Sequence, residues 1–151
     1  SNQSSDQAVI IPVNFTTYKK IVIESVYEPL NTSLGWRTCQ ARNSSGSAIN
    51  CTQTGWEYNP NWQQIYRTNA QVVSHGVYSY GAVYIKIELL CATSENYPSF
   101  QAQGFGGSDA SPYVQNFLGK VMAGGKDIKD FRFEMARPRS GGWVRAMGVR
   151  R

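Results

Sequence analysis

The stretch GAVYIKIELLCA, residues 81–92, constrains the fold more than any other part of the chain. Apolar side chains take every second position, and Tyr84, Lys86 and Glu88 stand between them. The apolar set is Val83, Ile85, Ile87, Leu89 and Cys91. Because successive side chains of a β-strand point to opposite faces, this alternation predicts a strand with one buried face.

Other stretches also indicate strands. YKKIVIESVY ends at a proline-containing turn, and WRTCQA and CTQTGW flank the polar loop RNSSGSAIN in the manner of a hairpin. Residues 112–122 also fit helical spacing, so helix and strand both stay open there. The chain is 41% hydrophobic and 17% charged over 151 residues, which suits one domain but supplies few residues for helix surfaces. We predict an all-β fold, an antiparallel β-sandwich with at most one short helix.

The C-terminal stretch FRFEMARPRSGGWVRAMGVRR contains two further strand candidates. Phe131, Phe133 and Met135 alternate with Arg132 and Glu134, the sequence Ser-Gly-Gly interrupts the run, and WVRAMGV follows. Glycine supplies the backbone angles of a tight connection between antiparallel strands. This pattern predicts a C-terminal β-hairpin.

Residues 1–14 are expected to form an N-terminal arm preceding a domain of residues 15–151. The first seven residues hold no large apolar side chain, whereas AVIIPVNF alternates from Val9 to Phe15. Such a segment is either an edge strand or an arm that lies on a neighbouring subunit. In the second case, deleting residues 1–12 would weaken assembly more than folding.

The net charge of +5 originates near the C-terminus. Residues 1–125 hold seven basic and seven acidic residues, while residues 126–151 hold eight basic and three acidic ones. Three roles are open for the arginines, in decreasing order of preference: contact with another subunit, binding of an anionic surface glycan, and binding of nucleic acid. The arginines concerned are Arg137, Arg139, Arg145, Arg150 and Arg151.

The three cysteines are expected to be reduced. Cys39 and Cys51 flank a loop across which a bridge is geometrically possible, and Cys91 is expected to be buried. With one histidine and no CxxC pair, the chain indicates no metal site and no cofactor. Sequons occur at Asn14, Asn31, Asn43 and Asn50. We attribute them to chance, because Asn14 lies in an alternating strand-like run and the polar opening lacks the pattern of a signal peptide. No stretch is long and apolar enough to span a membrane.

No residue pattern indicates catalysis. The single histidine, His75, lies beside glycine without a nucleophile elbow, and Glu24 and Glu28 have no enforced mutual geometry. The passage GFGGSD lacks the spacing of a phosphate loop. We therefore expect a protein that is not an enzyme.

The segment GWEYNPNWQQIY gathers aromatic residues among amides. Flat rings that stack on a pyranose, with amides for its hydroxyls, are what a glycan site requires. The competing interpretation is that the tryptophans pack under a loop and close one end of the sandwich. The glycan candidates are Trp56, Tyr58 and Trp62, with Tyr66 in the same segment and Tyr78 and Tyr80 as a second rim.

Several stretches together resemble a known family. They are FTTYKKIVIESVYEP, LGWRTCQARNSSG, GAVYIKIEL and the final strand ending in Gly148-Val149-Arg150. Over residues 15–151 they are similar to the C-terminal β-sandwich domain of tailed-bacteriophage tail and receptor-binding proteins. This resemblance implies a jelly-roll type of sandwich, and a homo-oligomer, with a trimer favoured, that contacts other virion proteins.

The resemblance also implies a function. It indicates a virion protein made in the host cytoplasm that attaches to host surface polysaccharide. Two alternatives are a head-decoration or baseplate protein anchored by its N-terminal arm, and a secreted lectin or adhesin.

Overall fold

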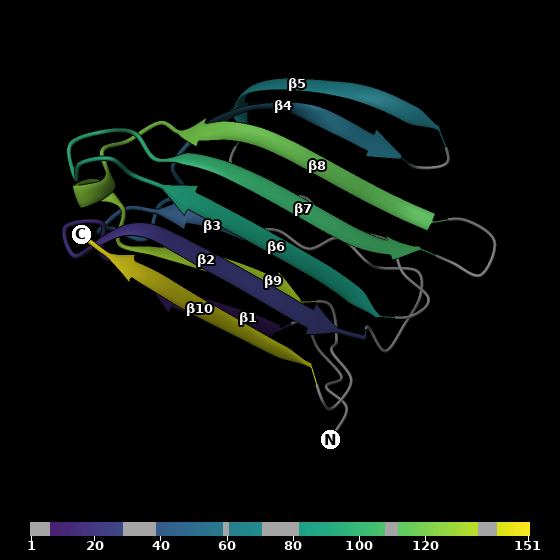
Figure 1. Ribbon diagram of the computed structural model, residues 1–151, viewed down its shortest axis with the longest axis horizontal. Helices are drawn as coiled ribbons and strands as arrows, with labels where there is room; N and C mark the ends of the chain where they lie inside the picture. Colours follow the sequence, from purple (N-terminus) through teal and green to yellow (C-terminus); the bar gives the residue numbers. More distant parts are fainter. Residues whose placement is uncertain (1–6, 29–38, 59–60, 71–81, 108–111, 136–141) are drawn as a thin grey trace.

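Two antiparallel sheets pack face to face in the computed structural model (Figure 1). It describes residues 7–28, 39–58, 61–70, 82–107, 112–135 and 142–151. Figure 1 looks onto the outer face of the larger sheet, with the smaller sheet behind it. The prediction of an all-β antiparallel sandwich is confirmed.

The larger sheet has seven strands in the order β10-β2-β6-β7-β8-β4-β5. Consecutive strands β6, β7 and β8 form a meander, and β4 and β5 form a hairpin. The bounds are β2 Tyr18–Tyr27, β4 Cys51–Tyr58, β5 Trp62–Ala70, β6 Val83–Leu90, β7 Ser99–Gly107, β8 Pro112–Val121 and β10 Trp143–Arg150.

The smaller sheet has three strands in the order β1-β9-β3. Their bounds are β1 Gln7–Pro12, β3 Cys39–Arg42 and β9 Asp130–Met135. A short 3₁₀ turn, Gly125–Asp127, precedes β9 and is the one helical element among the described residues. No helix in the described part of the chain is long and apolar enough to cross a membrane.

The core lies between the inner faces of the two sheets. Strand β6 contributes its alternate apolar residues, all less than 2% exposed, which confirms the sequence pattern. Across the core, β9 contributes Phe131 and Phe133, and the turn before β2 contributes Phe15. Because buried side chains alternate along each strand, each sheet has one apolar face, and the two apolar faces pack against each other.

The predicted C-terminal hairpin is wrong. Strand β9 pairs with β1 and β3 in the small sheet, whereas β10 pairs with β2 at the edge of the large sheet. As predicted, β9 and β10 are separate strands on either side of the Ser-Gly-Gly sequence. A break between two strands does not determine whether the two strands pair with each other. Both edges of β9 are already paired, with β1 and with β3, so β10 pairs with the free edge of β2 instead.

Two open alternatives are decided by the strand pairing. Residues 112–122 contain a strand, β8, in which Tyr113, Gln115 and Phe117 are buried at a spacing of two residues and Val121 continues the same face. The apolar part of the N-terminal segment is an edge strand of the protein's own small sheet, since β1 pairs with β9 from Gln7 to Pro12. Residues 1–6 lie outside the described part.

Candidate functional site

The outer face of the large sheet carries a row of apolar side chains that crosses all seven strands. Strand register places one residue of each strand in this row. We call it the aromatic row, and from β5 to β10 it consists of Trp62, Tyr58, Val114, Phe105, Tyr84, Val26 and Trp143. Five of its seven members are aromatic, so it presents flat rings along a line perpendicular to the strands.

The rings in this row are accessible, and four of the five lie beside another ring. Trp62, Phe105 and Trp143 are 63%, 46% and 42% exposed. Tyr58 lies beside Trp62 with 5.3 Å between ring centroids, and Tyr84 stacks on Phe105 at 5.8 Å. Neighbouring rings restrict one another, so little conformational entropy is left to lose when a ligand binds.

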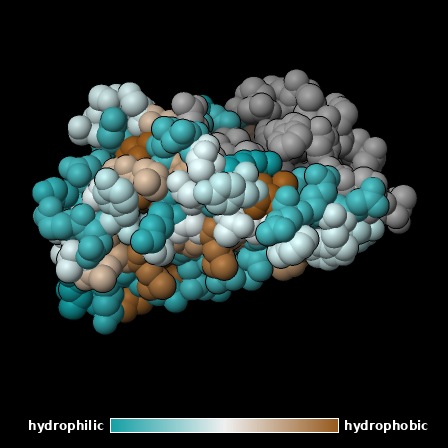
Figure 2. All heavy atoms as spheres, turned by 90° about the horizontal axis from the view of Figure 1, so that it is seen from above, coloured by the Kyte–Doolittle hydropathy of each residue, from teal (hydrophilic) through white to brown (hydrophobic). Residues whose placement is uncertain are grey.

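A second row, rich in hydrogen-bonding groups, runs beside the first. We call it the polar row; it consists of Gln64, Trp56, Asn116, Gln103, Lys86, Glu24 and Arg145. A third row follows, and its Gln101 amide lies 3.5 Å from the Asn116 side-chain oxygen. It consists of Tyr66, Thr54, Leu118, Gln101, Glu88, Val22 and Met147. Figure 2 looks at the molecule from above, the side on which Figure 1 draws β5. In this view the apolar residues, in brown, form separate spots among hydrophilic residues in teal and intermediate ones in pale colours.

Three of the glycan candidates are brought together by the β4–β5 hairpin. Trp56, Tyr58 and Trp62 share the outer face, and Tyr66 joins them. Trp56 and Trp62 are each more than half exposed, so the interpretation that they pack under a loop is wrong. The second rim, Tyr78 and Tyr80, lies outside the described residues.

Sequence reasoning missed Phe105, Tyr84 and Trp143 as members of the same surface. Each lies on an alternating strand, and Tyr84 was assigned correctly to the face opposite the core. Register between distant strands, which no local pattern states, places the three in one row.

Five charged side chains on this face are ion-paired within the chain. Arg145 donates to Glu24 through Nε at 2.7 Å, and Lys20 and Lys86 contact Glu88 at 3.0 Å and 2.8 Å. Burial, together with the Glu24 carboxylate, raises the pKa of the Tyr84 hydroxyl. Arg145 therefore acts within the chain, on the strand next to its own.

The other candidate arginines have different surroundings. Arg151 donates to the carbonyl oxygens of Phe15, at 3.0 Å and 2.8 Å, of Cys91, at 2.9 Å, and of Ala92. It ties the C-terminus to two loops rather than reaching outward. Arg150 is exposed on β10, and Arg137 and Arg139 lie outside the described residues.

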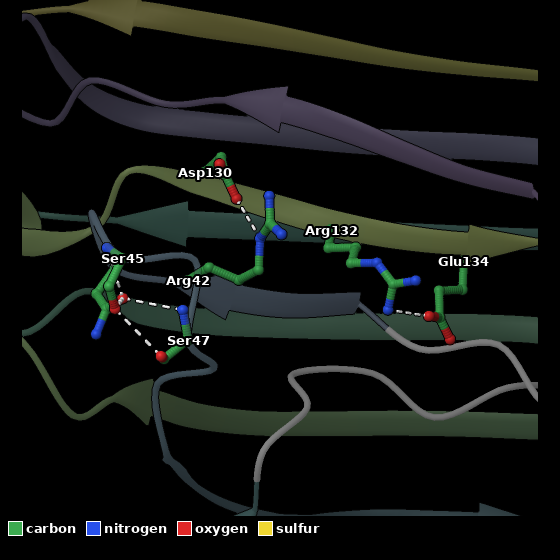
Figure 3. A network of polar contacts seen from close by, with 7 residues as sticks. Arg42, Ser45, Ser47, Asp130, Arg132 and Glu134 are labelled. Atoms are coloured by element: carbon green, nitrogen blue, oxygen red, sulfur yellow. Dashed lines mark hydrogen bonds and ion pairs between the residues drawn. The ribbon is translucent and has the colours of Figure 1, made fainter.

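A separate polar cluster lies on the small sheet (Figure 3). Arg42 of β3 contacts Asp130 of β9 at 2.6 Å, and this carboxylate is buried. Arg132 pairs with Glu134 farther along β9. The Asn43 side-chain oxygen accepts hydrogen bonds from backbone and hydroxyl groups of the loop that follows. The Arg42–Asp130 pair joins β3 to β9 and stabilises their pairing, whereas the other contacts lie within β9 or within one loop.

The cysteines are buried free thiols. Burial raises the pKa of Cys51 to about 12 and that of Cys39 still further, with a smaller contribution from Cys51. Cys91 is 1% exposed, as expected, and its thiol donates to the Thr93 carbonyl at 2.8 Å. Among the described residues, no group of three or more potential metal ligands occurs. His75 lies outside them.

No known protein family, curated protein or solved structure matches this chain.

Proposed function

We propose that the chain is a non-enzymatic binding module of a phage virion, a tail or receptor-binding component that attaches to polysaccharide on the host surface. The placement in a virion rests on the sequence resemblance. The attachment to polysaccharide rests on the outer face of the large sheet.

One observation carries the glycan proposal. Trp56, Trp62 and Tyr66 are 51%, 63% and 71% exposed on adjacent strands of one face. Exposing large rings to water is unfavourable, and a surface of this kind commonly marks a binding site. The amides of Gln64 and Asn116 flank Trp56 on either side in the polar row, so hydroxyl groups of a stacked sugar have partners within reach.

The experiment measures binding of the purified protein to an array of bacterial polysaccharides and to whole bacterial cells. We expect Trp56→Ala with Trp62→Ala to weaken binding about tenfold or more, because each ring contributes about 1 kcal/mol of stacking. Tyr97→Ala is the matched control, since Tyr97 is 49% exposed in the loop between β6 and β7. Unchanged binding by the double variant would exclude this face as the glycan site.

A specific observation also favours homo-oligomer formation through β10. This strand is an edge of the large sheet, and its Met147 and Val149 are 47% and 48% exposed. An edge strand with apolar side chains is suited to pairing with another chain, and Arg150 lies on the same strand. We expect Val149→Lys to lower the oligomer mass in solution while Leu118→Lys, on the exposed face of the interior strand β8, leaves it unchanged.

A further inference from the structure

We infer that the ligand is a linear, uncharged glycan that lies along the aromatic row, across the strands, and contacts Phe105 and Trp143 as well as Trp62. This inference rests on the proposed function. It adds the chemical class of the ligand, its direction on the sheet and two contact residues outside the segment that first suggested a glycan site.

The direction follows from the row itself. Seven strands separated by about 4.8 Å make the row about 29 Å long, which is longer than one sugar unit by several fold. Trp62 stands at one end, Phe105 near the middle and Trp143 at the other end. A chain of sugars can rest on successive rings along this line, whereas a single sugar can occupy only one of them.

The uncharged character follows from the distribution of charge. On β5, β4, β8 and β7, the aromatic, polar and third rows contain no charged residue. On β6 and β2, the charged residues beside the aromatic row are paired within the chain, including Lys86 with Glu88 and Glu24 with Arg145. An anionic polymer would compete with Glu24 and Glu88 for these cations, whereas a neutral polymer leaves the pairs intact.

The polar row gives the chain a second line of contacts. Gln64, Asn116 and Gln103 lie one row from the aromatic side chains on the same face. Each amide can donate and accept, so it can pair with a hydroxyl in either orientation. A ring beneath the sugar and an amide beside it, repeated from strand to strand, suit a repeating neutral polymer.

The test uses neutral dextran, mannan and galactan, each as a polymer and as its short oligomers, together with their sulfated or carboxymethylated forms. We expect at least one neutral polymer to bind more tightly than its short oligomer. Phe105→Ala and Trp143→Ala should each weaken polymer binding about 3- to 10-fold and weaken oligomer binding less. Trp62→Ala should weaken both.

Folding is separated from binding by Phe105→Leu, which retains apolar volume and removes the flat ring. It should melt like the parent protein and bind the polymer as weakly as Phe105→Ala. Equal affinity for polymer and oligomer, wild-type polymer binding by the Phe105 and Trp143 variants, or tighter binding of the charged forms would overturn the inference while the proposed function stands. Absence of binding to every glycan on the array and to cells would overturn both.

Discussion

The Arg145 guanidinium lies over the Trp143 ring, with its central carbon 5.1 Å from the ring centroid, and the same guanidinium donates to Glu24 on β2. One side chain thus joins the edge strand β10 to its neighbour by charge and holds the terminal ring of the aromatic row. This contact within the chain is an alternative to the hypothesis that Arg145 contacts another subunit.

Replacing Arg145 should lower the free energy of unfolding and leave the oligomer intact. Arg145→Ala removes an ion pair that is more than half exposed on the arginine side and a cation–π contact. Screening by solvent limits the loss to about 1 kcal/mol. Urea unfolding measures it, with Arg150→Ala as the control on the same strand. A lower oligomer mass for Arg145→Ala at unchanged stability would support the subunit-contact hypothesis instead.

Breaking the buried ion pair between Arg42 and Asp130 should lower the free energy of unfolding more than replacing Arg145 does. Arg42→Ala leaves the Asp130 carboxylate, 3% exposed, without its guanidinium. An uncompensated buried charge costs about 3 kcal/mol, so the midpoint of denaturant unfolding should fall clearly. Arg132→Ala, which removes a partly exposed pair on the same strand, should cost less than about 1 kcal/mol. Equal losses for the two variants would contradict the account of the small sheet.

Gly119 is required by the close approach of its neighbours. A Cβ atom there would lie 2.2 Å from the Thr52 carbonyl oxygen and 2.6 Å from the Phe100 ring. We expect Gly119→Ala to destabilise the fold by about 3 kcal/mol, since backbone and core ring would both have to move. Leu118→Ala, at the exposed neighbouring position, is the control and should change thermal stability little. A Gly119→Ala protein that melts with the parent would show that β8 and β4 separate easily.

The sequence predicted the strands better than their partners. Alternation assigned Tyr84 and Ile85 to opposite faces because that information is local. Which residues stand beside Tyr84 depends on pairing with strands that are distant in sequence, so Phe105 and Trp143 could not be placed next to it. The hairpin error has the same origin: the turn residues before β10 are local, whereas its preference for β2 over β9 depends on both sheets.

The buried thiols predict a loss of stability in alkaline solution. Burial raises the pKa of Cys51 from about 9 to about 12 in the folded protein, so the unfolded chain releases its proton first as the pH rises. The contribution is fully present below pH 9 and is lost between about pH 9 and 12, by up to about 1.4 kcal/mol per pH unit for each thiol. Unfolding free energies at a series of pH values should fall more steeply for the parent than for Cys51→Ala. Parallel curves would exclude the thiol as the cause.

Deleting residues 1–12 should damage the fold itself. Strand β1 pairs with β9 along its whole length, and its Ile11 is buried in the core beneath the small sheet. Removing it exposes one edge of β9 and part of the Phe131 and Phe133 packing, at a cost of about 4 kcal/mol or more from lost apolar burial and hydrogen bonds. Circular dichroism melting should show the loss at concentrations where the parent is fully folded, and deletion of residues 1–6, which removes no part of β1, is the matched control. A Δ1–12 protein that melts like the parent but has a lower oligomer mass would restore the interpretation of this segment as an assembly arm.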